Sequence, residues 1–357
     1  MKKIAQDSFK GQHVFVGIDV HKKQWVVSLR CNKMELQTVS MNPSPLELSH
    51  FMKKHYPEGI YHTVYEAGFC GFWIHEQLIA LNIDNRVVHP QDVPTMGKEK
   101  SQKRDPIDSH KLARELENGS LKGIFVPDVF HQQLRSLCRL REKTMREMIR
   151  LKNRIKGHLA FYGIEQPEGS QYGYWSKRFL ERLEKIEFQS PQGKTYLNFC
   201  LKQLYFLRTH LLSLIRELRM LVRQQVLIKP IVDRLHQVVG IGFLTTMTLY
   251  TELIDMRRFK KFDQLAAFVG LVPSLQSSGD WESRAHLSSR HNHYLRYLLI
   301  EAAWVAVRHD PALMERFIEL CKRMKKQEAI IRIAKNLLRR VRHVWLTGEP
   351  YQTGVLA

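Results

Sequence analysis

The first 120 residues alternate between short strand-like runs and helix-like runs. Three consecutive runs rich in Val, Ile and other strand formers, residues 13–20, 24–29 and 34–41, predict an antiparallel meander. Helices and strands then alternate, which is typical of a mixed α/β domain. The predicted helices cover residues 44–55 and 72–81 and a third that opens at Asp105-Pro106, and the predicted strands cover residues 61–66 and 85–89.

Beyond Pro127 the strand patterns stop and helical periodicity takes over. Residues 134–161 read as one long helix with nine Lys or Arg side chains. Leucines then recur at spacings of three and four from Leu197 to Leu221, with Cys200 among them, which predicts a coiled-coil seam. Such a seam requires a partner helix, and the pattern leaves open whether the basic helix or a second protomer supplies it.

A third, helical region follows from Ile231. It contains a Gly240-Ile241-Gly242 turn between apolar stretches, a helix at 265–270, a polar loop at 273–280, and closing helices at 292–307 and 311–342. We therefore predict three parts: an α/β domain over residues 13–130, a long-helix and coiled-coil connector over 131–228, and a mainly α-helical domain over 231–345.

Charge is distributed unevenly between these parts. The chain has 357 residues and a formal net charge of +21; residues 1–130 contribute +2 and residues 131–357 contribute +19. Such asymmetry indicates that the C-terminal two thirds bind a polyanion. No apolar run reaches the roughly 18 residues of a membrane span, and the five scattered cysteines suggest neither a disulfide framework nor a zinc knuckle. We expect a cytosolic chain with no membrane partner.

Four carboxylates stand at distinctive places in the α/β part. Asp19 lies within an apolar strand, where an unpaired charge is costly to bury, and Glu66 ends a later strand. Asp105 and Asp108 open a helix and share one face. Converging carboxylates suit Mg²⁺, and two such ions can serve phosphoryl transfer. The alternatives are helix capping by Asp105 and Asp108, a turn cap by Asp19, and a lysine partner for Glu66.

These residues resemble a known family. The stretches Gly17-Ile18-Asp19-Val20, Tyr65-Glu66-Ala67-Gly68 and Arg104-Asp105-Pro106-Ile107-Asp108 resemble the Asp-Glu-Asp-Asp tetrad of a RuvC-like, ribonuclease H-type nuclease domain. Followed by a coiled coil, then by Val239-Gly240-Ile241-Gly242 and Gly270-Leu271-Val272-Pro273, they resemble the DEDD-type insertion-sequence transposases, which are bridge-RNA-guided DNA recombinases. The resemblance covers roughly residues 13–345.

The resemblance implies a reaction and a set of partners. The family carries a nucleophilic serine immediately before a glycine, and Ser278 before Gly279 occupies that position; Ser277 is the neighbouring competitor and Ser274 the weaker one. The tetrad would hold Mg²⁺, with two ions expected, in a site composed from different protomers. The implied partners are donor and target DNA, an element-encoded bridge RNA, and further copies of the chain in a dimer or tetramer, within a bacterial or archaeal cytoplasm at the nucleoid.

Basic residues near both motifs are candidate nucleic-acid contacts. Each of them also has a simpler interpretation as a solvated surface charge, just as Trp281 and Tyr294 either stack on bases or fill the core. The candidates are Lys98, Lys100, Lys103 and Arg104 before the Asp pair, and Arg284, Arg290, His291 and Arg296 after the serine loop.

Two other functions fit parts of the pattern. A junction-resolving nuclease would use the tetrad alone with water as the nucleophile, and a non-catalytic nucleic-acid scaffold would use only the long helices. The Ser278 loop distinguishes a transposase from the nuclease, and the complete tetrad argues against the scaffold.

Overall fold

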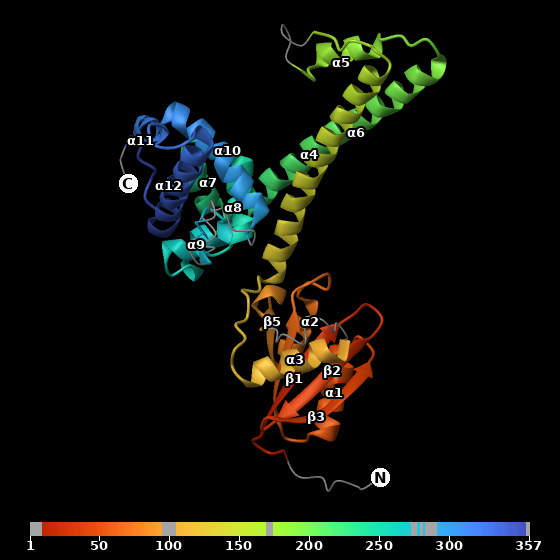
Figure 1. The fold of residues 1–357 in the computed structure, drawn as a ribbon, viewed down its shortest axis with the longest axis vertical. Helices are drawn as coiled ribbons and strands as arrows, with labels where there is room; N and C mark the ends of the chain where they lie inside the picture. The colour runs from red at the N-terminus through yellow and green to blue at the C-terminus, as the bar shows by residue number, and fades with distance from the viewer. Residues whose placement is uncertain are drawn as a thin grey trace. The chain divides into compact units, whose positions relative to one another are not determined.

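The computed structural model describes residues 9–94, 105–168, 174–272, 277–278, 281–282 and 291–354. The chain divides into two compact units, Met1–Val126 and Pro127–Ala357 (Figure 1). No helix in the described ranges is both long and apolar enough to cross a membrane.

The N-terminal unit is built on a five-stranded mixed sheet in the order β3-β2-β1-β4-β5. The first three strands form the predicted antiparallel meander, whereas β4 runs parallel to β1 and β5 runs parallel to β4. The mixed α/β architecture predicted from the sequence is confirmed. The strands are β1 (His13–Val20), β2 (Trp25–Cys31), β3 (Met34–Met41), β4 (Ile60–Glu66) and β5 (Asp84–Val88).

Helices cover both faces of this sheet. On one face, Val16 and Ile18 of β1 pack in the same buried cluster as Leu48 of α1 (Pro45–His55) and Leu78 of α2 (Trp73–Ala80). On the other face, Val64 of β4 packs against Leu112 and Leu116 of α3 (Asp105–Glu117). Because side chains alternate along a strand, the residues between the α1–α2 positions of β1 point toward α3.

The C-terminal unit begins with a helical arm, defined here as α4 (Val129–Phe161), α5 (Lys177–Glu184) and α6 (Pro191–Gln224). Helices α4 and α6 are antiparallel: Leu159 clusters with Leu197 at one end, and Leu134 clusters with Val222 at the other. The leucine-rich face of α6 therefore packs on the basic helix of the same chain.

The remaining helices form a separate globular core within this unit. The prediction of one helix over 311–342 is wrong, because α11 ends at Cys321 and α12 starts at Lys326. The intervening turn lets Met324 pack on the core. The helices are α7 (Lys229–His236), α8 (Phe243–Leu253), α9 (Phe262–Val269), α10 (His293–His309), α11 (Pro311–Cys321) and α12 (Lys326–Thr347).

One short strand lies within residues 273–280, the region predicted as a polar loop, and its partner strand follows directly after that region. Strand β6 (Ser277–Ser278) pairs antiparallel with β7 (Trp281–Glu282), with Ser278 opposite Trp281. The two residues between the strands, Gly279 and Asp280, form a dipeptide typical of tight hairpins.

Candidate active site

Asp19 and Glu66 lie next to each other at one edge of the N-terminal sheet. Strands β1 and β4 are parallel and Ile18 is aligned with Tyr65, so the next residue of each strand is an acid. Ile18 and Tyr65 are buried against α1 and α2. Alternation therefore directs the Asp19 and Glu66 side chains to the opposite face, the face that α3 covers.

Helix α3 approaches β1 closely because Gly17 has no side chain. A Cβ at Gly17 would overlap the Ser109 carbonyl oxygen and would lie 2.5 Å from the Ala113 nitrogen and 2.9 Å from Leu112 Cβ. A buried hydrogen bond of 2.8 Å between the Ser28 and Ser109 hydroxyls fixes the helix on β2 as well. Asp108, next to Ser109, is thereby held over the sheet edge.

These three carboxylate residues line a single cavity. It has a volume of about 160 Å³ and is walled by the ends of β1 and β4, by the turn after Glu66 and by α3. The Asp19 side chain is 21% exposed, and its Oδ2 lies 3.1 Å from His21 Nε2, within hydrogen-bonding distance. The residues that line the cavity are Ile18, Asp19, Val20, Glu66, Ala67, Gly68, Phe69, Cys70, Asp108 and Leu112.

The donor chemistry of this cavity fits Mg²⁺, which prefers carboxylate oxygens and keeps several waters. Among the described residues, however, no three potential ligands are already close enough together to enclose an ion. The fourth predicted ligand, Asp105, begins α3, and its side chain lies outside the described part of the chain. The described carboxylates Asp19, Glu66 and Asp108 therefore line one cavity.

In the C-terminal unit, Glu252 is a buried carboxylate that contacts Asn292 at the start of α10. This carboxylate is 3% exposed, on α8, and Arg139 of α4 donates to both of its oxygens, from Nε to Oε1 at 2.7 Å and from Nη2 to Oε2 at 2.9 Å. Burial alone would raise the pKa of Glu252, but the hydrogen bonds and charge of Arg139, with further contributions from Arg135 and Asn292, lower it below its ordinary value.

Asn292 links that carboxylate to both sides of the serine segment. Its Nδ2 donates to Glu252 Oε2 at 2.8 Å, and its Oδ1 caps α10. Its backbone nitrogen donates at 2.9 Å to the carbonyl of Phe268, near the end of α9. The end of α9 and the start of α10 are thus joined, and residues 271–291, which include Ser277 and Ser278, connect these two points. We call Glu252, Arg139, Arg135 and Asn292 the Glu252 cluster.

The same junction encloses the Arg296 side chain. Gly270 has φ +84°, and a Cβ there would lie 2.8 Å from Arg296 Nε. Burial lowers the pKa of Arg296. The predicted nucleic-acid contact Arg296 therefore packs against the backbone at Gly270, and its role in binding stays a prediction.

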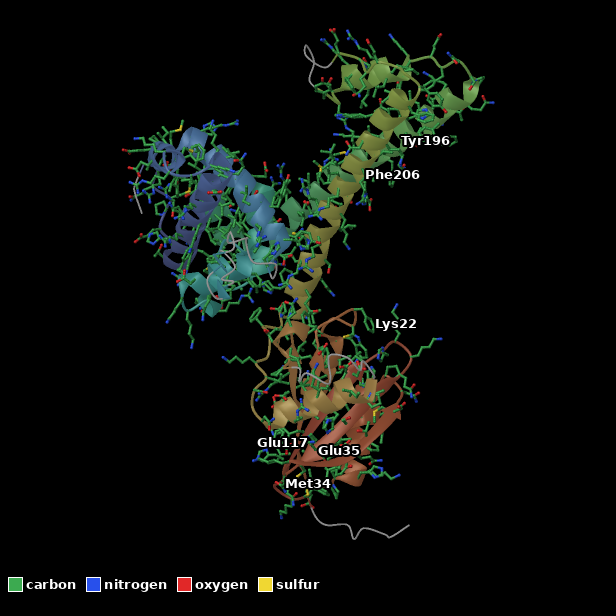
Figure 2. All side chains as sticks on the ribbon, in the orientation of Figure 1. Lys22, Met34, Glu35, Glu117, Tyr196 and Phe206 are labelled. Atoms are coloured by element: carbon green, nitrogen blue, oxygen red, sulfur yellow. The ribbon has the colours of Figure 1, made fainter. Side chains whose placement is uncertain are left out.

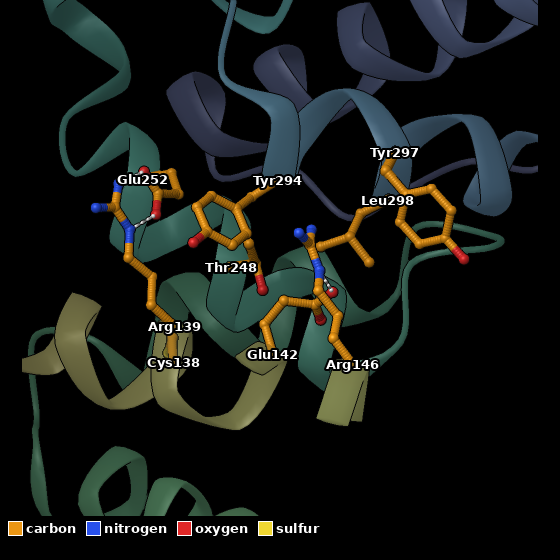
Figure 3. Close-up of a pocket in the computed structure, with 9 residues that line it drawn as sticks. All are labelled: Cys138, Arg139, Glu142, Arg146, Thr248, Glu252, Tyr294, Tyr297 and Leu298. Atoms are coloured by element: carbon orange, nitrogen blue, oxygen red, sulfur yellow. Dashed lines mark hydrogen bonds and ion pairs between the residues drawn. The ribbon is translucent and has the colours of Figure 1, made fainter. Parts of the chain in front are cut away.

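Glu252 and Arg139 also line a small cleft that combines cations and aromatic rings (Figure 3). Tyr294 of α10 lies between two guanidinium groups of α4, with Arg139 5.2 Å and Arg146 5.6 Å from the ring centroid. These contacts pack Tyr294 against α4, and its stacking on bases stays a prediction.

Several other predicted site residues cannot be placed. Ser277 and Ser278 belong to β6, but their side chains, and that of Trp281 in β7, lie outside the described part of the chain. The remaining predicted positions outside the described residues are Lys98, Lys100, Lys103, Arg104, Ser274, Gly279, Arg284 and Arg290.

Sequence reasoning missed the Glu252 cluster. One signal was available, because Glu252 is the single charged residue of the otherwise apolar and hydroxyl-bearing α8 sequence FLTTMTLYTEL. An acid there needs a buried partner. That its partner is Arg139, 113 positions earlier, could not be read from local pattern.

Comparison with known proteins identifies the family. A family model for DEDD transposases of the IS110 kind matches residues 16–164, and a model described as the transposase IS116/IS110/IS902 family matches residues 232–319. The two matches include the four predicted carboxylates and both candidate serines, in that order. The chain belongs to the DEDD-type insertion-sequence transposases.

Individual relatives agree with this assignment. The transposase is 28% identical over 253 residues to the transposase for insertion sequence element IS1111A of Coxiella burnetii, covering 69% of this chain and 66% of that protein. It is 27% identical over 366 residues to a putative transposase of Sinorhizobium fredii, covering 91% and 90%. A probable family 20 transposase of Pseudomonas aeruginosa is 28% identical, covering 68% and 70%.

Proposed function

We propose that this transposase cleaves and rejoins DNA strands with Ser278 as the nucleophile and with Asp19, Glu66, Asp105 and Asp108 as ligands for Mg²⁺. The observation that carries the proposal is the cavity on which Asp19, Glu66 and Asp108 converge from β1, β4 and α3. Three acids from separate elements at one sheet edge are unexpected for capping or surface charge alone. The mixed sheet also supports a RuvC-like, ribonuclease H-type domain.

The chemistry is a phosphoryl transfer. The Ser278 Oγ attacks a DNA phosphorus atom, an Oγ–P bond forms while one P–O bond to a neighbouring nucleoside breaks, the hydroxyl proton leaves Oγ, and the released oxygen takes up a proton. A second strand end then reverses the exchange and frees the serine. When bound, Mg²⁺ would neutralise phosphate charge and favour the ionised attacking and leaving oxygens. The four carboxylates would hold it, and the Glu252 cluster would fix both ends of the serine segment.

We also propose the partners that the family resemblance implies. Donor and target DNA are the substrates, and an element-encoded bridge RNA selects them. The active assembly contains more than one copy of the chain, with the arm helices as a coiled coil that spaces the protomers. The high positive charge of residues 131–357 supports contacts with both nucleic acids.

The test is formation of a covalent adduct. Purified protein, Mg²⁺, element RNA, and donor and target DNA are expected to give a protein–DNA adduct, visible by denaturing gel, which Ser278→Ala abolishes and Ser277→Ala leaves intact. Asp19→Asn or Asp108→Asn should prevent it, because each removes a negative oxygen from the metal cavity while keeping the side-chain volume.

Three outcomes would contradict parts of this proposal. Loss of the adduct in Ser277→Ala but not in Ser278→Ala would transfer the role to the neighbouring serine. Strand cleavage by Ser278→Ala at the wild-type rate would show that water is the nucleophile, as in a junction-resolving nuclease. Adduct formation at the wild-type rate by Asp19→Asn and Asp108→Asn would exclude the carboxylate cavity from the reaction.

A further inference from the structure

The arm helix α6 has two faces of different composition. Its inner face is a nearly continuous aliphatic seam buried against α4, with Leu197, Leu204 and Leu218 at most 1% exposed. Its opposite face carries the large side chains Phe199, 68% exposed, and Phe206, 67% exposed. Further residues follow at intervals of three and four and are all exposed. We call Phe199, Lys202, Phe206, Thr209, Ser213, Arg216 and Met220 the outer stripe.

The aromatic rings of the outer stripe lie beside cationic or ionisable groups. Lys202 Nζ is 5.7 Å from the centroid of the Phe199 ring. Phe206 stacks on His210 with the planes 4° apart and the centroids 5.9 Å apart. The two phenyl rings are seven residues, hence about 10 Å, apart along the helix. Figure 2 labels Phe206 on this arm, together with Tyr196 from the first part of α6.

The composition of this stripe argues against a second copy of the chain as its occupant. A second coiled-coil seam would need Leu, Ile or Val at successive core positions, whereas here aromatic residues alternate with Lys, Thr, Ser and Arg. Over its whole length α6 has six Lys or Arg and one acid, Glu217. The outer stripe itself holds Lys202 and Arg216 and no acid, so the stripe of a second copy would bring no carboxylate to pair with these cations.

The same composition fits a polyanion with exposed bases. Unpaired nucleotides stack on aromatic rings while neighbouring cations bind the phosphates, and base stacking does not require a particular sequence. Paired bases in a duplex do not offer their faces in this way. Helix α4, on which α6 packs, adds nine Lys or Arg against two acids, so the arm as a whole attracts nucleic acid.

We propose that the outer stripe of α6 binds an unpaired stretch of nucleic acid, with bases stacked on Phe199 and Phe206 and phosphates on Lys202 and Arg216. The inference deepens the proposed function, on which it rests for the presence of nucleic acid, and it needs neither the serine nor the metal. Single-stranded RNA and single-stranded DNA share this chemistry, and separate arms of one experiment distinguish them.

The experiment measures binding of the full chain to fluorescein-labelled oligonucleotides by anisotropy. The probes are an unstructured 20-nucleotide RNA, the DNA of the same sequence, and the corresponding DNA duplex. Loss of one stacking ring is expected to weaken single-strand binding about fivefold to a hundredfold. Phe199→Ala/Phe206→Ala should therefore reduce affinity for at least one single strand, while duplex binding and the salt dependence stay as in the wild type.

Matched variants separate stacking from folding. Leu212→Ala removes another exposed apolar side chain, 56% exposed, that lies about 120° around the helix from Phe206, and it should bind like the wild type. Phe199→Leu/Phe206→Leu keeps apolar side chains without rings and should bind as weakly as the double alanine variant, whereas Phe199→Trp/Phe206→Trp keeps two stacking surfaces and should bind like the wild type.

Other results would overturn the proposal. Unchanged affinity of the double alanine variant for both single strands would exclude stacking. A smaller mass by light scattering with unchanged affinity would show that the stripe joins copies of the chain. An equal loss of duplex binding would show that it does not select unpaired bases. Because no adduct is measured, failure here leaves the Ser278 proposal standing, and failure of the adduct experiment leaves this one standing.

Discussion

Glycine 17 shows how one missing side chain positions the carboxylate cavity. Its α3-facing side is occupied by the backbone of Ser109 and Ala113 and by Leu112 Cβ. Backbone atoms of a helix cannot rotate away as a flexible side chain can, so a methyl group at Gly17 would push α3 off β1. Asp108 would move with the helix, away from Asp19 and Glu66.

We therefore predict that Gly17→Ala lowers the free energy of unfolding by about 1–3 kcal/mol, the usual cost of overpacking a core. Urea unfolding followed by circular dichroism measures this change. Adduct formation should fall as well, because the metal ligands are displaced. Unchanged stability together with unchanged adduct yield would show that the close approach of α3 has no role.

Gly157 provides the matched control. It lies inside α4, and a Cβ there meets nothing within 4 Å. Alanine costs less conformational entropy than glycine in a helix, so Gly157→Ala should raise the free energy of unfolding by about 0.5–1 kcal/mol. The same substitution is thus expected to have opposite signs at the two positions.

At the scale of elements, the Glu252 cluster joins α4, α8 and the start of α10. Removing the charge in Glu252→Gln keeps an oxygen that Asn292 can reach, but leaves Arg139 and Arg135 without their carboxylate. Because Arg139 is 40% exposed, solvent compensates part of this loss. We expect destabilisation by about 1–3 kcal/mol, below the roughly 3–5 kcal/mol that is typical when a fully buried pair is broken.

Acidification tests the same contact through the pKa of Glu252. This pKa is lower in the folded protein than its ordinary 4.5, so the stabilisation is complete above about pH 4.5 and is lost as the pH falls through the folded value. Thermal unfolding at pH 7 and at pH 3.5 should show a smaller pH effect in Glu252→Gln than in the wild type. Parallel profiles for the two proteins would contradict this account.

Glu142→Gln is the control for that prediction. Glu142 contacts Arg141 and Arg146 on α4, yet it is 20% exposed and Arg146 is 46% exposed. A surface pair of this kind contributes about 0–1 kcal/mol. The difference between the losses of unfolding free energy in Glu252→Gln and Glu142→Gln measures how much burial, and contact with three helices, add to the contribution of an ion pair.

The elements were largely predictable because their signals are local. Alternation in β1 and the leucine spacing of α6 each depend on residues a few positions apart. The break between Cys321 and Lys326 was missed, since the apolar and basic pattern continues across it and only packing of Met324 on the core reveals the turn. Likewise, the leucine spacing of α6 does not identify its partner helix, and the structure shows that α4 of the same chain is that partner.

The residues of the candidate site also differ in how far local sequence pattern reveals them. Asp19 and Glu66 could be singled out because an acid at the end of an apolar strand is costly to bury without a partner, and parallel pairing then brings the two together. The link from Glu252 to Arg139 and Asn292 could not be, because it spans α4, α8 and α10. Long-range polar contacts leave no periodic trace in a sequence.

At the scale of the whole molecule, most of the net positive charge lies in the C-terminal two thirds of the chain, the part proposed to bind nucleic acid. Residues 1–130 carry a net charge of +2 and include the carboxylate cavity, whereas residues 131–357 carry +19. A neutral surface around acidic ligands keeps their cation affinity, and a basic arm binds phosphates wherever the chain meets nucleic acid.

This division predicts where the salt dependence of binding originates. Each phosphate contact to a single strand contributes about 0.7 to the slope of log affinity against log salt. Lys202→Gln/Arg216→Gln/Arg223→Gln removes three exposed cations of α6 and should reduce that slope by about 2. The measurement is anisotropy with the 20-nucleotide RNA between 50 and 300 mM salt.

Lys33→Gln/Lys53→Gln/Lys54→Gln removes as much charge from exposed positions of the N-terminal unit and should leave the slope unchanged. If both triple variants reduced it equally, the protein would respond to total charge alone, and the arm would lose its assignment as the nucleic-acid-binding part.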